Sequence, residues 1–334
     1  MGNSSDQGVP AEVRAFAERL SGRVRAALPL WEWAWHPEWR VSREEFQQAL
    51  AEHGVPEWPF LWPLEEAFAG ADVDLGAGEL KMGIAADLPY SSRARLVDED
   101  GQLRFIALSD WGNDTLVLDA KGRVCVLEEL GQVLVMAPSF ESFLEYHALS
   151  KLLRDDLFSA HMVPRTAAAD IALRLGVPPV PEAYNDVFRW WQDKDVTLFA
   201  WVEHDLPAAV WTTTLEGLAR VLDAAAEVCP GVKIKPIPSY AKEHVQILPV
   251  EEIRARAPSE ATLSSRPGAR RVELLGEDSV HPGKAPSTGD VWISGEGESL
   301  QVVVLERHEG EVVNFWRLTP RGSEALLRST YGNG

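Results

Sequence analysis

The chain has 334 residues, of which 46% are hydrophobic and 25% are charged, as is typical of a globular protein with a buried core. At roughly 100–200 residues per domain, this length indicates two or three domains that need no disulfide bonds for stability. The 51 Asp and Glu residues outnumber the 32 Lys and Arg residues and give a net charge of −19. This charge argues against direct binding to nucleic acid or to an anionic membrane, because both need cationic surfaces.

Cys125 and Cys229 are the only cysteines, and we expect both to be buried thiols, because two are too few for a disulfide framework or a Cys-based zinc site. No run of 18 apolar residues occurs, so no membrane helix is predicted. Residues 1–15 lack the basic and apolar regions of a signal peptide. We therefore expect a cytoplasmic protein.

Residues 11–28 carry apolar side chains every three or four positions, which predicts one amphipathic helix ended by Pro29. The next segment, 31–39, holds four tryptophans spaced mostly by two, which favours an extended strand with its indoles on one face. Two interpretations stay open for these indoles. They form a binding platform, or they cover the core of the adjacent domain.

A helix is predicted to begin after Ser42, because Ser42 and Glu45 have the spacing of a capping box and Val41 and Phe46 that of a hydrophobic staple. It is expected to end near Gly54. A second short helix is predicted around residues 61–68, and residues 70–102 are expected to be a loop with one or two weak strands.

Four β-rich runs follow, at residues 103–109, 115–120, 123–129 and 132–137. The connections between them are too short for parallel crossovers, so they predict an antiparallel meander. Ser139 is expected to cap a final helix that runs toward Leu152. This order of helices, sheet and helix predicts an α+β domain over residues 41–155.

The rest of the chain is predicted to form separate units. Helices are expected at 166–175 and 183–193, a strand at 196–203, a helix behind a Thr213–Glu216 capping box, and strands at 232–237 and 244–249, which together indicate a small α/β domain over 156–255. Residues 256–289 resemble a linker with weak strand character near 272–275. The range 256–334 would thus be a linker and a β-hairpin unit that ends in a short helix after Ser323, and residues 1–40 an N-terminal extension.

Motifs that would indicate catalysis are weak. The Gly76–Gly78 segment fits neither a dinucleotide-binding nor a P-loop pattern, and the histidines lack the spacing of a metal site. Glu203, His204 and Asp205 follow a predicted strand, but adjacent side chains in extended chain point to opposite faces. We therefore expect no cofactor, no metal and no catalytic site. An enzyme centred on His204 is one of three functional hypotheses and has the least support from the sequence; the other two are given below.

Negative charge is concentrated in residues 41–155, which hold 9 Lys and Arg against 21 Asp and Glu, a net −12 of the total −19. The first 40 residues balance at 5 against 5, and residues 156–334 hold 18 against 25. Such a concentration is either a solvated face or a surface that attracts a cationic protein. The candidate partner-binding residues lie in predicted loops and hairpin ends: Asp98, Glu99, Asp100, Asp110, Trp111, Asp114, Glu128 and Glu129.

Three segments of this range resemble the SUKH superfamily, best known for bacterial immunity proteins that bind and neutralise a toxin. They are the capped helix SREEFQQALAEHGVP, the stretch FIALSDWGNDTLVLDAKGRVCVLEE with its Gly112-Asn113-Asp114 turn, and the helix in MAPSFESFLEYHAL. The resemblance covers about a third of the chain and implies a SUKH-like α+β fold, an antiparallel meander flanked by helices, over about residues 41–155.

The resemblance, with the clustered acidity, predicts a non-enzymatic immunity protein that binds a cognate toxin through an acidic surface, and a basic nuclease is one candidate for that toxin. The alternative is an intracellular adaptor or regulatory scaffold, whose middle and C-terminal units would bind different proteins.

Overall fold

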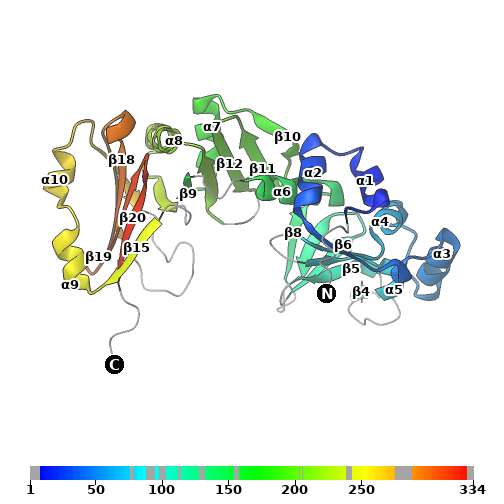
Figure 1. The fold of residues 1–334 in the computed structure, drawn as a ribbon. Helices are drawn as coiled ribbons and strands as arrows, with labels where there is room; N and C mark the ends of the chain where they lie inside the picture. The colour runs from blue at the N-terminus through cyan, green and yellow to red at the C-terminus, as the bar shows by residue number, and fades with distance from the viewer. Residues whose placement is uncertain are drawn as a thin grey trace. The chain divides into compact units, whose positions relative to one another are not determined.

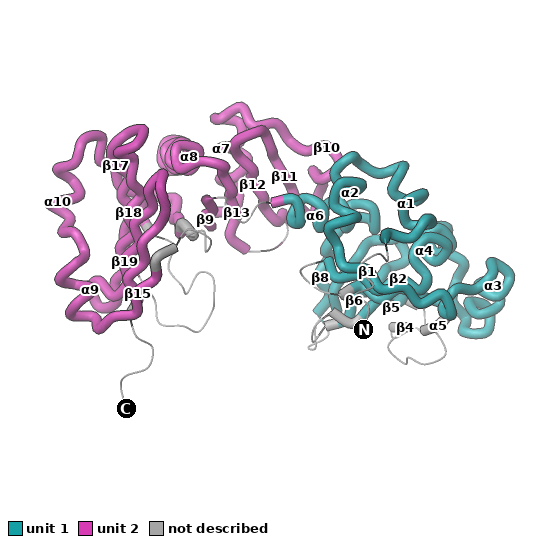
Figure 2. Tube along the Cα trace, viewed as in Figure 1, with its two compact units in different colours: residues 1–152 teal, residues 153–334 magenta. Residues whose placement is uncertain are grey.

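The computed structural model describes residues 8–75, 79–87, 95–97, 103–111, 114–127, 132–153, 158–202, 204, 206–237, 243–274 and 288–328. The chain is an α+β protein that divides into two compact units, residues 1–152 and 153–334 (Figure 2).

The first unit begins with short helices and one strand. The helix predicted for 11–28 is broken into two, because the Ser21 side chain accepts hydrogen bonds from the amides of Arg23 and Val24 and starts a new helix there. The predicted strand of the tryptophan segment is confirmed. The elements are α1 (Ala11–Ala17), α2 (Gly22–Ala27), η1 (Leu28–Leu30), β1 (Glu32–Trp35) and η2 (Pro37–Trp39).

The capping box of the next helix is confirmed. Ser42 Oγ accepts from the Glu45 amide at 3.2 Å, and the Glu45 carboxylate accepts from the Ser42 amide at 2.7 Å. The helix ends before Gly54, which takes a left-handed conformation (φ +65°). The second helix is also confirmed, whereas the stretch expected to be mostly loop contains three strands and a short helix. These elements are α3 (Arg43–Glu52), α4 (Leu61–Phe68), β2 (Ala71–Asp74), β3 (Glu79–Lys81), α5 (Ile84–Asp87) and β4 (Arg95–Val97).

The antiparallel meander is confirmed, with β4 added at its edge, in the order β4-β5-β6-β7-β8. Ser139 caps the closing helix, since its Oγ accepts from the Ser142 amide at 3.2 Å. A smaller sheet of order β1-β2-β3 lies beside the meander, where the Lys81 amide donates to Ser109 Oγ. The remaining elements are β5 (Leu103–Trp111), β6 (Asp114–Asp119), β7 (Val124–Leu127), β8 (Val133–Ala137) and α6 (Phe140–Leu152).

Aromatic rings join the helices of this unit. The ring of Phe68 on α4 makes edge contacts with Phe16 on α1 and Phe140 on α6, at centroid distances of 5.1 and 5.2 Å. The buried Glu145 carboxylate of α6 accepts from both the amide and the hydroxyl of Ser21, and so holds α2 against α6. The N-terminal extension therefore belongs to the core of the first unit.

The second unit contains one sheet of twelve described strands, in the order β10-β11-β12-β13-β9-β14-β16-β17-β18-β19-β20-β15 (Figure 1). The ranges 156–255 and 256–334, predicted as separate units, both contribute strands to it. The elements of the first range are β9 (Phe158–Val163), α7 (Ala167–Leu175), β10 (Pro179–Tyr184), β11 (Phe188–Gln192), β12 (Val196–Trp201), β13 (Ala208–Thr212), α8 (Leu215–Val228), β14 (Lys233–Ile237) and β15 (Glu243–Leu248), followed by α9 (Val250–Arg256), which extends one residue beyond it.

Several predictions for this unit were wrong. Residues 183–193 form the β10–β11 hairpin instead of a helix, because the Asn185 side chain accepts from the amides of Val187 and Phe188 and turns the chain. Strand β13 was missed. The cap of α8 is Thr214, whose hydroxyl accepts from the Gly217 amide, and not Thr213.

The predicted linker contains a helix capped by Ser259 and a strand, and the helix predicted after Ser323 is a strand. The predicted strands before it and the turn at His308–Gly310 are confirmed. These elements are α10 (Glu260–Ser264), β16 (Arg270–Leu274), β17 (Thr288–Ser294), η5 (Gly297–Ser299), β18 (Gln301–His308), β19 (Glu311–Thr319) and β20 (Gly322–Arg328).

Helices cover both faces of the C-terminal strands. Val302 and Val304 of β18 belong to a core with α7 and α8, whereas Val303 and Leu305 belong to a second core with α9 and α10. Alternate residues of one strand thus enter different cores, as the two-residue period of a strand requires. Figure 1 shows α9 and α10 along one side of these strands.

Candidate functional site

Most of the predicted partner-binding residues lie outside the described part of the structure: Asp98, Glu99, Asp100, Glu128 and Glu129. Asp110 and Trp111 occupy the last two positions of β5, and Asp114 the first position of β6. The register pairs Trp111 with Asp114 and Asp110 with Thr115. The backbone therefore brings these three predicted positions together at one hairpin end.

The strand order places the described residues that flank the other candidates at two ends of the meander. Leu127, which precedes Glu128, pairs with Thr115 at the same end as Trp111 and Asp114. Val97 and Leu103, which flank residues 98–102, pair with each other at the opposite end, near the β6–β7 hairpin. Because β5 has nine residues and a strand rises about 3.3 Å per residue, the two ends are on the order of 25 Å apart.

The β6–β7 hairpin is held by Asp119. Its carboxylate accepts from the amides of Lys121 and Arg123 at 2.9 Å and from the Arg123 guanidinium at 2.7 Å. Gly122 takes the left-handed conformation that closes the turn, with φ +80°. Asp119 is thus a structural carboxylate, which sequence alone does not separate from the binding candidates.

Helix α3 and the chain after it present four exposed carboxylates, Glu44, Glu45, Glu52 and Glu57, which we call the acidic helix face. Glutamine side chains hold two of them, since Gln47 donates to Glu57 and Gln48 to Glu52. The hydrogen bonds from Ser42 lower the pKa of the Glu45 carboxyl, so it stays ionised. Glu44, Glu45 and Glu52 were predicted to lie on a helix, and Glu57 after it, and none of the four was among the candidate binding residues.

The tryptophan segment is part of the β1-β2-β3 sheet. Trp31 is buried, and Trp33 and Trp35 are half-buried, whereas the alternate residues Glu32 and Ala34 are exposed. The expected placement of the indoles on one face is confirmed for Trp33 and Trp35 of β1, whereas Trp39 lies in η2 and not in the strand. Trp33 Nε1 donates to the Leu28 carbonyl at 2.8 Å, so this indole holds the strand to the preceding turn.

Few of the residues considered for catalysis lie in the described part of the structure. The His204 ring packs edge-on against Trp201 with centroids 5.2 Å apart, and its neighbours Glu203 and Asp205 lie outside the described residues, as does Gly76–Gly78. Burial raises the pKa of the Cys125 thiol to about 11, so it is not a nucleophile at neutral pH. Cys229 is half-buried, not fully buried as expected.

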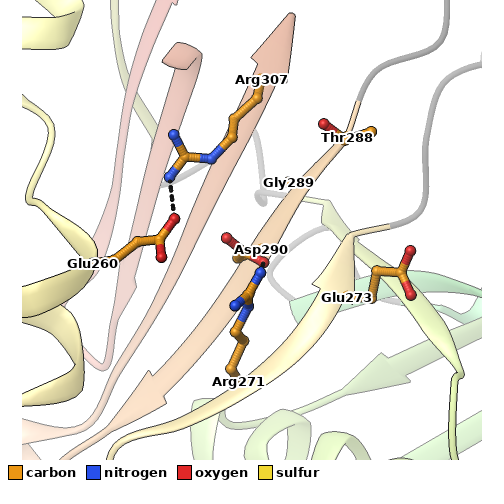
Figure 3. Close-up of a pocket in the computed structure, with 7 residues that line it drawn as sticks. All are labelled: Glu260, Arg271, Glu273, Thr288, Gly289, Asp290 and Arg307. Carbon is orange, nitrogen blue, oxygen red and sulfur yellow. Dashed lines mark hydrogen bonds and ion pairs between the residues drawn. The ribbon is translucent and has the colours of Figure 1, made fainter. Parts of the chain in front are cut away.

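A cleft of about 560 Å³ opens in the second unit on β16, β17, β18 and the start of α10 (Figure 3). Its charged side chains come from neighbouring strands: the register pairs Glu273 with Asp290 and Thr288 with Arg307. Partners in register project to one face, which places these groups on the same side of the sheet. The described lining is Glu260, Arg271, Glu273, Thr288, Gly289, Asp290 and Arg307.

Ion pairs organise the charged cleft. Arg271 binds the Asp290 carboxylate, and Arg307 donates to Glu260 at 2.9 Å. Lys233 of β14 reaches Glu273 at 3.0 Å. Asp290 is 3% exposed, whereas the side chains of Arg271 and Glu273 are each 55% exposed. The cleft therefore holds one buried carboxylate beneath charges that solvent reaches.

The charged groups that line the cleft are held in ion pairs. Arg271 pairs with Asp290, Arg307 with Glu260, and Glu273 with Lys233. Exposed ion pairs cost little to exchange, because each contributes at most about 1 kcal/mol. The cleft can thus accept a polar ligand that carries charges of both signs.

In the described ranges, no three His, Cys, Asp or Glu side chains are grouped so that they could hold a metal ion. None of the helices in those ranges is both long and apolar enough to span a bilayer. No protein-family model matches the chain, and neither a curated protein nor a solved structure is significantly similar to it.

Proposed function

We propose that this chain is a non-enzymatic immunity protein that binds and neutralises a cognate cationic toxin through the acidic surface of its first unit. The observation that carries the proposal is the concentration of charge, a net −12 over residues 41–155, on a module in which the capped helix α3 and then α4 precede an antiparallel meander and a closing helix. Anionic surfaces attract cationic partners at long range and raise their association rate.

The element order supports this proposal. Helices α3 and α4 precede the sheet, β5 to β8 form the antiparallel meander, and α6 follows it. The three motifs that resemble the SUKH superfamily fall on α3, on β5 to β7 and on α6. We therefore propose that the elements of the first unit are also arranged in space as in a SUKH domain.

The position of the exposed carboxylates also supports it. The acidic helix face carries four glutamates, and the nearby cation Arg43 lies over the Trp62 ring, 5.8 Å from its centroid. Two further acidic positions, Asp110 and Asp114, lie at the β5–β6 hairpin end. A basic toxin would meet negative charge at each of these places, in the way that a basic nuclease meets phosphate groups.

The two ends of the meander allow a sharp test of which carboxylates bind. One variant changes Asp110, Asp114, Glu128 and Glu129 to Lys, and a second changes Asp98, Glu99 and Asp100 to Lys. We expect the variant at the end that faces the toxin to associate at least tenfold more slowly at low salt. The association rate of that variant should also depend less on salt concentration.

A matched control changes three exposed carboxylates of the second unit, Asp186, Glu216 and Glu251, to Lys. This control alters net charge as much as the Asp98–Asp100 variant does, so it separates local contact from the field of the whole protein. Unchanged association in both meander variants would refute the meander ends as the binding surface.

The toxin itself is sought by expressing the product of the adjacent gene with and without this chain. Restored growth on co-expression, together with a stable complex of the two purified proteins, supports immunity. If the product of the adjacent gene is harmless and does not bind, the immunity proposal is wrong.

A second candidate function is an intracellular adaptor, and the charged cleft of the second unit favours it, because that cleft is built from a different unit than the acidic surface. Affinity capture from the source cell distinguishes the two. One dominant toxin supports immunity, whereas several partners that are lost separately on mutation of the cleft or of the meander ends support an adaptor.

A further inference from the structure

The sheet of the second unit ends at β15, which pairs in parallel with β20 over residues 243–248. Among the described strands, β15 has no neighbour on its other side. The residues of an edge strand that do not bond to the neighbouring strand direct their N–H and C=O groups outward, where they can pair with another chain. This edge is therefore a ready acceptor for an extended segment.

An apolar row of the core runs out to this edge. Val291, Val304, Trp316, Ala325 and Val245 are register partners across five successive strands, so their side chains lie in one row on one face. The first two are 0% and 1% exposed, and Ala325 is 0% exposed, whereas Val245 is 47% exposed. The row thus ends on a side chain that is half open to solvent.

Ile247 lies two residues farther along β15, on the same face as Val245, and is 68% exposed. Its partner in β20 is the half-buried Leu327. Val245 and Ile247 are therefore two adjacent apolar side chains at a strand edge, a combination that monomeric proteins avoid because it invites association.

The usual protection of an edge strand is missing at these positions. Residues 245–248 contain no charged residue and no proline, although lysine, proline or a bulge normally blocks such an edge. Two nearby arginines are paired with carboxylates: Arg256 with Glu252 and Glu324, and Arg254 with Glu311. These arginines therefore add little unpaired positive charge beside the strand.

A two-fold axis at Gln246 makes this edge complementary to itself. In an antiparallel pair of two β15 strands centred on Gln246, Val245 of each copy lies opposite Ile247 of the other. The apolar row that ends on Val245 would therefore continue across the junction onto Ile247 of the second copy. Such a contact uses the same patch on both subunits, as in most homodimers.

We propose that β15 pairs antiparallel with β15 of a second copy of this chain, with Gln246 on the two-fold axis, and forms a homodimer. The self-complementary register favours a second copy over an unrelated strand, since another partner would need apolar side chains at matching alternate positions. The proposal does not depend on the immunity function or on any toxin.

The first test measures mass by sedimentation velocity over a concentration series of the full chain. We expect a monomer–dimer equilibrium that Ile247→Lys weakens by roughly 100-fold or more, because the substitution acts twice in a symmetric contact and replaces a buried apolar pair with a charge. The control is Leu173→Lys on α7, where Leu173 is 82% exposed and off the sheet edge. It should dimerise like the parent.

The second test fixes the register. In a Cys229→Ser background, Gln246→Cys should form an intermolecular disulfide under mild oxidation, because the Cα atoms at position 246 of the two copies would face each other about 5 Å apart. Val245→Cys should not, because its two copies are offset along the strands. A monomer at all concentrations, a dimer unaffected by Ile247→Lys, or equal cross-linking of both cysteine variants would overturn the proposal.

Discussion

Gly70 and His36 connect two segments of the first unit through a backbone hydrogen bond. The His36 amide donates to the Gly70 carbonyl at 2.7 Å, and Gly70 has a φ of +84°. A Cβ atom at position 70 would overlap the carbonyl oxygen of His36. This close approach joins the tryptophan segment to the start of β2, and only glycine permits it.

We predict that Gly70→Ala destabilises the chain much more than Gly54→Ala. Both glycines have positive φ, but a Cβ at position 54 meets no atom within 4 Å. Gly54→Ala should therefore cost about 1 kcal/mol of conformational strain, and Gly70→Ala about 3 kcal/mol or more, because backbone atoms must also move. Urea unfolding followed by tryptophan fluorescence measures both, and equal losses would contradict the role assigned to His36.

Removing the capping box should destabilise helix α3. Ser42→Ala deletes the hydroxyl that accepts from the Glu45 amide, and we expect a loss of about 1 kcal/mol in the free energy of unfolding. Ser42→Asp keeps an acceptor and is the control that should restore stability. Hydrogen exchange of the α3 amides locates the effect, and unchanged exchange in Ser42→Ala would show that this cap contributes little.

The ion pairs of the charged cleft should differ in their contribution to stability. Arg271→Met leaves the Asp290 carboxylate buried without its guanidinium, and we expect a loss of about 2 kcal/mol. Lys233→Met breaks the ion pair with Glu273, in which the Lys233 side chain is 44% exposed and the Glu273 side chain 55% exposed. The loss in the free energy of unfolding should therefore be below about 0.5 kcal/mol. Chemical denaturation at two salt concentrations compares them, and a larger loss for Lys233→Met would reverse our assignment.

Stability should fall in mild acid because of His147. This side chain on α6 is 1% exposed, and burial lowers its pKa to about 3 from 6.5. Since the folded-state pKa is the lower one, the unfolded chain binds a proton first as the pH falls through 6.5. The free energy of unfolding therefore decreases from pH 6.5 down to about 3, and by about 2 kcal/mol at pH 5 from this residue alone.

His147→Phe keeps an aromatic ring beside Phe143, whose centroid lies 4.4 Å away, and should reduce the difference in stability between pH 7.5 and pH 5 by about 2 kcal/mol. His53→Gln on the same unit is the control. An NMR titration in which the His147 ring protonates near pH 6.5 would refute the prediction directly.

Local signals in the sequence predicted the capped helices and the antiparallel meander of the first unit. The Ser42 capping box, the Ser139 cap and the short turns of the meander all act within a few residues, so they can be read without knowing the fold. The break between α1 and α2 was not predicted, because the apolar spacing of Val13, Phe16 and Val24 continues across Ser21.

The second unit was harder to predict for two physical reasons. Residues 183–193 place Ala183, Val187 and Trp190 at a helix-like spacing, although the Asn185 turn makes them a hairpin. Strand β20 lies between β19 and β15, with Ala325 and Leu326 buried on opposite faces, so its apolar residues show no alternation.

The candidate sites could be predicted only in part. Charge counting found the acidic first unit, but the separation of Val97 and Leu103, which flank residues 98–102, from Asp110 and Asp114 depends on strand order, which spacing does not encode. The charged cleft was missed because Arg271, Asp290 and Arg307 are far apart in sequence and meet only through the sheet register.

The pairing of β15 with β20 also constrains how the protein is made. His244 pairs with Glu324, eighty positions later in the chain. While the ribosome is still adding those positions, the segment with Val245 and Ile247 has emerged without the strand that will hold it. Nascent chains translated from one messenger RNA would then expose the same apolar segment, with Val245 and Ile247, to one another. Slow translation of residues 249–321 should therefore increase aggregation during synthesis.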